Sequence, residues 1–198
     1  MNRTTLLAFA CLFTALSCKA LDLTPHRRIA GVQDNTYRYY FQDGPKKIAF
    51  RTDPSTSVDG SAGKASFEFN DLGTAGMTIS RSSLTPDTPL EGASAKQYQD
   101  LAAASLPSGS AKVVLEKDVP NPITINGWTS HQYVFTCSYY GASLKRSVTI
   151  LNFNKKDQLI ISISATPSNY DKAYARGYAI LNSIYEMKPG EDQKDPGT

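Results

Sequence analysis

The sequence predicts an α+β fold, in which an antiparallel β-sheet of about seven to nine strands packs with two amphipathic helices. Several short segments alternate apolar and polar residues with a period of two, which is typical of strands that bury one face. Two longer segments, residues 94–106 and 168–187, repeat apolar residues at helical spacing instead. The strands occur in runs and do not alternate one by one with helices, which favours an antiparallel sheet.

The clearest alternation lies in the C-terminal half of the chain. Asn126-Gly127 is a strong turn signal, because this pair supplies the positive φ angles that a two-residue hairpin needs. The strand that follows, and those at residues 144–153 and 159–165, each place apolar side chains on one face. Ile160 interrupts the polar side of the last run, so we expect another element to cover it. The apolar face of the first run is formed by Tyr133, Phe135, Cys137 and Tyr139.

A closing helix is predicted from a cap at Ser168 to about Met187, with Asp171 in its first turn. Gly177 lies inside its apolar stripe, although Gly costs a helix roughly 1 kcal/mol relative to Ala. We therefore expect this helix to approach the sheet closely at Gly177. The stripe consists of Tyr170, Tyr174, Gly177, Leu181 and Ile184.

The N-terminal half contains weaker versions of the same patterns. Residues 53–64 and 82–93 are expected to be loops, because they are rich in Pro, Ser and Gly. In chain order we expect strands at residues 37–41, 46–52, 65–70 and 77–81, a helix at 94–106 and a strand at 112–119.

These elements predict one domain over residues 36–188. Residues 21–35 are polar and are expected to form an extended lead-in to it. Residues 189–198 are charged and contain Gly and Pro, so we expect a disordered tail.

Residues 1–20 are typical of a secretory signal sequence, with Arg3 before an apolar stretch that is too short for a membrane-spanning helix. Residues 18–20 suit cleavage after Ala20, whereas residues 15–18 resemble an imperfect lipoprotein signal that would attach lipid to Cys18. Either route predicts export, to the bacterial periplasm or the extracellular space, with a lipoprotein as the alternative. No later segment is apolar enough to predict a membrane span.

Composition excludes several classes of protein. Hydrophobic residues make up 40% of the chain and charged residues 20%, which is typical of a folded domain. The net charge of +3 becomes +1 without Arg3 and Lys19, so charge does not predict nucleic-acid binding. Cys137 is the single cysteine outside residues 1–20, so the core must hold the domain without an internal disulfide.

The C-terminal half also resembles the PsbP-like superfamily. The resemblance covers residues 127–184 and consists of an aromatic strand around Tyr133-Val134-Phe135, a turn containing Gly141, two further strands and a closing helix. It implies an α-β-α sandwich around an antiparallel sheet and a role in binding or assembly. Because the resemblance is one of pattern, no functional residue is carried over from it.

No arrangement of residues predicts catalysis, a metal site or a cofactor. His26 lies in the lead-in, and His131 is six residues from Cys137, about 20 Å along an extended strand. Direct pairing of this thiol and imidazole is therefore excluded, and a structural cysteine is expected. Glu116 and Asp118 would share one face of a regular strand, where a solvated charged face is the expected role.

Tyrosine is the unusual component, at 11 residues. Most tyrosines are expected to pack between sheet and helix, but Trp128, Tyr139 and Tyr140 flank loops at strand ends. They form the candidate interaction patch. The leading hypothesis is a non-enzymatic exported module that binds a protein partner or assists envelope assembly. The alternative is a carrier of a small apolar molecule or lipid, with a pocket between sheet and helix.

Overall fold

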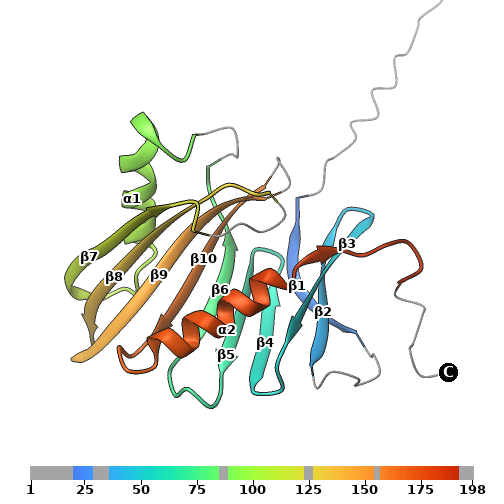
Figure 1. Ribbon diagram of the computed structural model, residues 1–198, viewed down its shortest axis with the longest axis horizontal. Coiled ribbons are helices and arrows are strands. Elements are labelled where there is room, and N and C mark those ends of the chain that lie inside the picture. Colours follow the sequence, from blue (N-terminus) through green and yellow to red (C-terminus); the bar gives the residue numbers. More distant parts are fainter. Residues whose placement is uncertain (1–19, 29–35, 85–88, 123–126, 154–156, 192–198) are drawn as a thin grey trace, which may run out of the picture.

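The computed structural model describes residues 20–28, 36–84, 89–122, 127–153 and 157–191. These residues form two antiparallel sheets and two α-helices, so the α+β fold is confirmed (Figure 1). The elements in chain order are β1 (Asp22–Arg28), β2 (Tyr37–Asp43), β3 (Lys46–Thr52), β4 (Thr56–Ser61), β5 (Lys64–Phe69), β6 (Gly76–Arg81), η1 (Gly92–Ser94), α1 (Ala95–Ala104), β7 (Ala111–Pro120), β8 (Ser130–Tyr139), β9 (Ala142–Phe153), β10 (Asp157–Ala165), α2 (Tyr170–Asn182) and β11 (Tyr185–Glu186).

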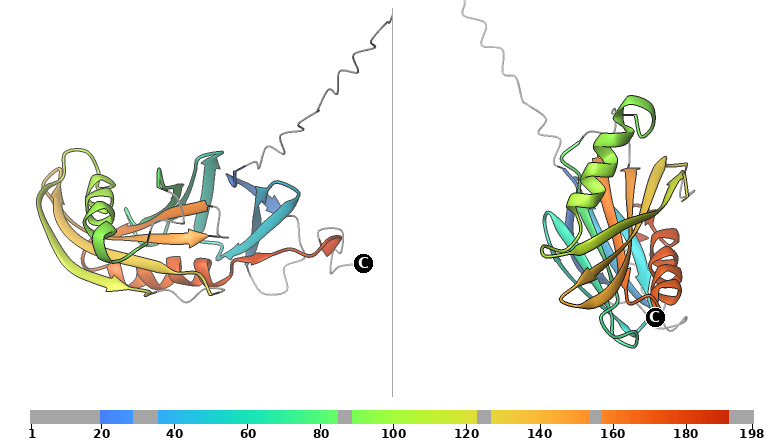
Figure 2. Two further views of the ribbon diagram at one scale, coloured as in Figure 1. Left: turned by 90° about the horizontal axis from the view of Figure 1, so that it is seen from above. Right: turned by 90° about the vertical axis from the view of Figure 1, so that its left-hand side faces the viewer.

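The larger sheet has seven strands in the order β4-β5-β6-β10-β9-β8-β7, and the smaller has four in the order β1-β2-β3-β11. The smaller sheet packs its Phe50 against Phe67 of β5, with ring centroids 5.6 Å apart. Helices α1 and α2 lie on opposite sides of the larger sheet, as the right-hand view of Figure 2 shows. This arrangement is an α-β-α sandwich extended by a second sheet.

Two hydrophobic clusters on opposite faces of the larger sheet explain this layering. Leu159, Ile161 and Ile163 of β10 point to the α2 side, where they join Leu181 in the larger cluster. Ile160 points the other way and packs with Tyr98 of α1, so the expectation that another element covers it is confirmed. Alternate side chains of β10 therefore pack into two hydrophobic cores, one on each face of the larger sheet.

The N-terminal region differs from the sequence prediction in two places. Residues 21–35 are not simply a lead-in, because β1 pairs with β2 and Leu21 and Leu23 are buried in the larger cluster. Residues 53–64 are not simply a loop, because β4 forms a hairpin with β5. The folded domain therefore begins before residue 36.

The closing helix is shorter than predicted. It ends at Asn182, and the chain continues into β11, which pairs with β3. Its N-cap is Asn169, one residue later than expected, and makes no side-chain capping hydrogen bond. The part of the predicted tail that the structure describes is held in place, because Glu191 accepts a hydrogen bond from the Tyr185 hydroxyl at 2.7 Å. Asn126 of the predicted Asn126-Gly127 hairpin lies outside the described residues.

Candidate interaction surface

The turn between β8 and β9 holds Tyr140 in an unfavourable backbone conformation. Tyr139 pairs with Ala142, and the two turn residues, Tyr140 and Gly141, have φ angles of 46° and 82°. Positive values at both positions define a tight hairpin turn for which Asn-Gly is the preferred pair. For a residue other than Gly, this left-handed conformation costs about 1–2 kcal/mol.

The side chain of Tyr140 makes few packing contacts that would offset this conformational cost. Its side chain is 86% exposed, and its ring contacts that of Tyr139 at a centroid distance of 4.6 Å. Backbone strain at an exposed aromatic residue is a reason to consider a functional role for it. Tyr140 is thus exposed and Tyr139 half-buried, and their role as an interaction site stays a prediction.

The neighbouring edge strand β7 carries the other exposed apolar residues. Val113 is 46% exposed and Val114 is 55% exposed. With Tyr140 they are the large hydrophobic residues that are exposed in the part of the chain that the structure describes. Concentration of exposed apolar side chains in one region is typical of protein interaction sites.

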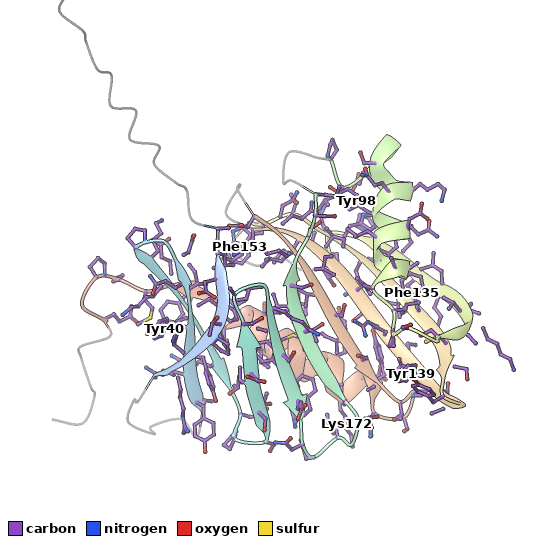
Figure 3. The ribbon with its side chains drawn as sticks, turned by 180° about the vertical axis from the view of Figure 1, so that it is seen from behind. Tyr40, Tyr98, Phe135, Tyr139, Phe153 and Lys172 are labelled. Atoms are coloured by element: carbon purple, nitrogen blue, oxygen red, sulfur yellow. The ribbon has the colours of Figure 1, made fainter. Side chains whose placement is uncertain are left out.

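These residues lie at the same end of the larger sheet, because β7 pairs with β8 just before the turn. Ala111 is opposite Ser138 and Val114 is opposite Thr136, so Tyr140 lies roughly 10 Å beyond this region along the strand direction. We call Val113, Val114, Tyr139 and Tyr140 the β7 corner. A depression of about 240 Å³ adjoins it, lined by Lys112, Thr136, Cys137, Ser138, Gly141 and Ser143. Figure 3 labels Tyr139 at this end of the sheet.

The backbone of β7 is too irregular for a partner strand to pair along its whole length. The register with β8 shifts between Ala111 and Val114 and again between Leu115 and Lys117. Lys112 has a φ of 52°, which bends the strand locally. Bulges and charged side chains are the devices by which edge strands avoid adding further strands. The β7 corner can therefore recognise a partner mainly through its side chains.

The two acidic residues of the second half of β7 do not form an acidic pair. Glu116 forms an ion pair with Lys145 at 2.8 Å, whereas Asp118 contacts the imidazole of His131. Glu116 is the extra residue at the second register shift of β7, so it does not share a face with Asp118 as it would in a regular strand. Each acidic side chain instead has a partner on its own side of the sheet.

Trp128 does not belong to this surface. It is half-buried and packs on Phe153, with ring centroids 4.5 Å apart. It precedes β8, whereas Tyr139 ends that ten-residue strand, so roughly 30 Å separate them. The structure therefore keeps two of the three predicted patch residues together and places the third in the larger core.

His131 and Cys137 are both buried and do not approach each other. His131 is 6% exposed and stacks on Tyr133, with ring centroids 4.9 Å apart. Cys137 is 5% exposed, and its sulfur lies 3.7 Å from the Ser110 hydroxyl. They lie on one strand at the spacing that the sequence predicts, and the surroundings of Cys137 are those of a packing residue.

The tyrosines of α2 pack in a row against the sheet. Ring centroids are 5.9 Å apart for Tyr170 and Tyr174, and 6.1 Å apart for Tyr174 and Tyr178. The hydroxyl of Tyr174 accepts a hydrogen bond from the Gln132 side chain at 3.1 Å, and burial raises the pKa of Tyr170 to about 12. These side chains fill space between α2 and the strands β8 and β9. The carrier hypothesis would require a pocket in that space.

Other kinds of site receive no support from the residues that the structure describes. Among them there is no group of three or more His, Cys, Asp or Glu residues close enough to hold a metal ion. None of the helices in the described ranges is long and apolar enough to cross a membrane. Cys18, the alternative lipid attachment site, lies outside the described residues.

The fold and the candidate site thus define the class of protein, which is an α+β sandwich with an exposed aromatic corner. No family model and no curated protein matches the sequence. Among solved structures, the chain is similar to PA94, a Pseudomonas aeruginosa protein of unknown function. The TM-score is 0.42 and the identity 16%, over 67% of this chain and 89% of that one.

The chain is also similar to the cyanobacterial PsbP protein (CyanoP) of Synechocystis sp. PCC 6803. Here the TM-score is 0.42 and the identity 14%, over 86% of this chain and 98% of that one. This protein belongs to the family that the sequence pattern resembles. Neither protein's role is assigned to this chain.

Proposed function

We propose that the chain is an exported, non-enzymatic module that binds a partner protein through the β7 corner. The observation that carries this proposal is the position of Tyr140, an 86% exposed aromatic residue held at a φ of 46°. Folding alone would favour Asn or Gly at this position. Aromatic side chains that can be buried by a partner are the ones that contribute most to protein–protein binding.

The surroundings of Tyr140 support the same role. Val113 and Val114 extend the apolar surface, and the Glu116–Lys145 ion pair lies beside it. An apolar centre with charged residues at its margin is the usual composition of a protein interface. The bulges of β7 favour recognition by side chains, so the partner needs apolar groups that fit around Tyr140.

The proposal is tested by site-specific photo-crosslinking in the producing cell. A photoreactive amino acid is placed at Tyr140, and in a separate variant at Lys64, which is exposed on β5 in the larger sheet. A discrete adduct with one protein is expected from position 140 and not from position 64. The adduct should disappear when Val114→Lys is added, because a charge then enters the apolar surface.

Two results would contradict the proposal. One is an adduct that forms equally from both positions, which would indicate random collisions. The other is an adduct from position 140 that persists unchanged with Val114→Lys. The fold of each variant is checked by the fluorescence of Trp128, which packs against the larger core.

A further inference from the structure

Two strained backbone positions adjoin the depression beside the β7 corner. Lys112 lines it from β7, and Gly141, the residue after Tyr140, lines it from the turn. Lys112 has a φ of 52° and Tyr140 a φ of 46°. The other non-Gly residue with a positive φ in the described part of the chain is Asn121, and Asn tolerates this conformation. Backbone strain that the residue type does not explain clusters at binding sites, and both such positions lie at this depression.

Free hydroxyl groups line the same depression. Thr136, Ser138 and Ser143 contribute them. Ser138 pairs in register with Ser143, so their side chains share one face of the sheet, with Cβ atoms about 5 Å apart. Thr136 precedes Ser138 by two residues on β8 and therefore points to the same face. None of the three hydroxyls forms a hydrogen bond with another residue that the structure describes, so each can donate one to a ligand.

Lys112 supplies the charge of this site. It is exposed and forms no ion pair with a residue in the described ranges. Lys145 points to the same face as Thr136, its partner in register, but it is already paired with Glu116 at 2.8 Å. None of the described residues that line the depression is acidic. The charge that the protein leaves uncompensated at the depression is therefore positive.

The chemical group that complements this site is a carboxylate. An anion can accept hydrogen bonds from an ammonium and from several hydroxyls at once, and charge-assisted hydrogen bonds are roughly twice as strong as neutral ones. The partner in the proposed function is a protein. Its anionic groups are the side chains of Asp and Glu and the carboxylate at the chain end.

The apolar residues of the β7 corner favour an acidic side chain over a chain end. The lining residues Lys112 and Gly141 are the chain neighbours of Val113 and Tyr140, which are both exposed. A segment whose carboxylate enters the depression can thus contact an apolar side chain on either side of it. An Asp or Glu within a segment has residues on both sides to make these contacts, whereas a C-terminal carboxylate has them on one side only.

We propose that the depression binds an Asp or Glu side chain of the partner protein that lies between apolar residues of the partner sequence. Lys112 forms an ion pair with the carboxylate, and the hydroxyls of Thr136, Ser138 and Ser143 donate hydrogen bonds to its oxygens. The apolar neighbours of the acidic residue pack on Val113 and Tyr140. This inference rests on the proposed function of the β7 corner and adds the chemistry of the segment that it recognises.

The test repeats the crosslinking experiment with the photoreactive amino acid at Tyr140 and adds Lys112→Glu. Reversal of this charge should lower the yield of the partner adduct about tenfold, because a charge-assisted hydrogen bond is replaced by repulsion of the carboxylate. Lys117→Glu is the matched control, since Lys117 is exposed on the same strand but does not line the depression. It should change the yield by less than about twofold. Thermal unfolding shows whether both variants remain folded.

The outcomes separate this inference from the proposed function. Absence of an adduct without Lys112→Glu would overturn both. An adduct that persists unchanged with Lys112→Glu, or that falls equally with Lys117→Glu, would overturn the carboxylate site and leave the β7 corner as an interaction surface.

Mass spectrometry of the adduct then identifies the partner segment. The segment should contain an Asp or Glu between apolar residues. Replacing that residue by Lys in the partner should restore the adduct with Lys112→Glu to at least about half of its original yield, because the charges are then exchanged. A segment whose only carboxylate is the chain end, or an exchange of charges that restores no adduct, would overturn the proposal.

Discussion

A side-chain carbon added to Gly177 of α2 would lie 2.6 Å from the Cδ1 atom of Ile163 on β10. It would also lie 3.3 Å from the sulfur of Met77 on β6. The helix therefore rests directly on the sheet at this point. The sequence expectation of a close approach at Gly177 is confirmed, and the contact fixes the distance between the two layers.

Gly177→Ala should destabilise the domain by up to about 2 kcal/mol. The gain in helix propensity is roughly 1 kcal/mol, whereas overpacking a buried contact costs typically 1–3 kcal/mol. Adding Ile163→Val, which removes the Cδ1 atom, should recover part of this loss. Denaturant unfolding of the two single variants and the double variant measures the coupling, and a more stable Gly177→Ala variant would show that the helix can move away.

Stability should depend on pH through Arg176. Its guanidinium donates two hydrogen bonds to the Asp71 carboxylate, which lowers the pKa of Asp71 to about 2, and also forms an ion pair with Asp53 at 3.1 Å. An unfolded Asp has a pKa of about 3.9. The Asp71 contribution is therefore complete above pH ~4 and is lost as the pH falls toward ~2.

Arg176→Gln should remove part of this pH dependence. The difference in unfolding free energy between the wild type and this variant should shrink as the pH falls from ~5 to ~2. Lys96→Gln is a matched control, because it breaks an exposed ion pair with Asp100 on α1. A constant difference across this pH range would mean that Asp71 does not keep its charge through Arg176.

The thiol of Cys137 should react slowly in the folded protein. It is 5% exposed and lies between β7 and β9 in the larger sheet. In a shortened protein that begins at Ala20, Cys137 is the only cysteine, so a thiol reagent reports on Cys137 directly. Labelling should accelerate by orders of magnitude in denaturant, and Cys137→Ala should retain partner binding. Rapid labelling of the native protein would contradict a packing role.

Tyr140→Asn should maintain or increase stability. Asn adopts a positive φ more readily than Tyr, which favours the hairpin by roughly 0.5–1 kcal/mol, and little packing is lost because Tyr140 is 86% exposed. Thermal and denaturant unfolding of this variant provide the measurement. A clear loss of stability would show that Tyr140 stabilises the fold, which would contradict its proposed role in interaction.

The sequence could predict the elements whose pattern is local. The runs in β8, β9 and β10 alternate clearly and form strands, but both faces of these strands are largely buried, because a hydrophobic cluster lies on each side of the sheet. β4 was missed because its sequence, TSVDGS, is rich in small polar residues and becomes a strand through pairing with β5. β1 was missed because Pro25 and charged residues obscure the buried pair Leu21 and Leu23.

The candidate site was predictable only in part, for a related reason. Tyr139 and Tyr140 precede a Gly at the end of an alternating run, which indicates a turn. The exposure of Val113 and Val114 depends on β7 being the edge of the sheet, and strand order is set by pairings distant in sequence. Trp128 also sits near a turn, but its burial depends on Phe153, which the local pattern cannot reveal.

The proposed role of Tyr140 is to bind the partner protein. The most direct measurement places the photoreactive residue at Val113 and compares the yield of the partner adduct in the wild type and in the Tyr140→Asn background. The yield should fall at least tenfold, about 1.4 kcal/mol of binding free energy, while the unfolding free energy stays equal or rises. An unchanged yield in a stably folded Tyr140→Asn variant would contradict the claim.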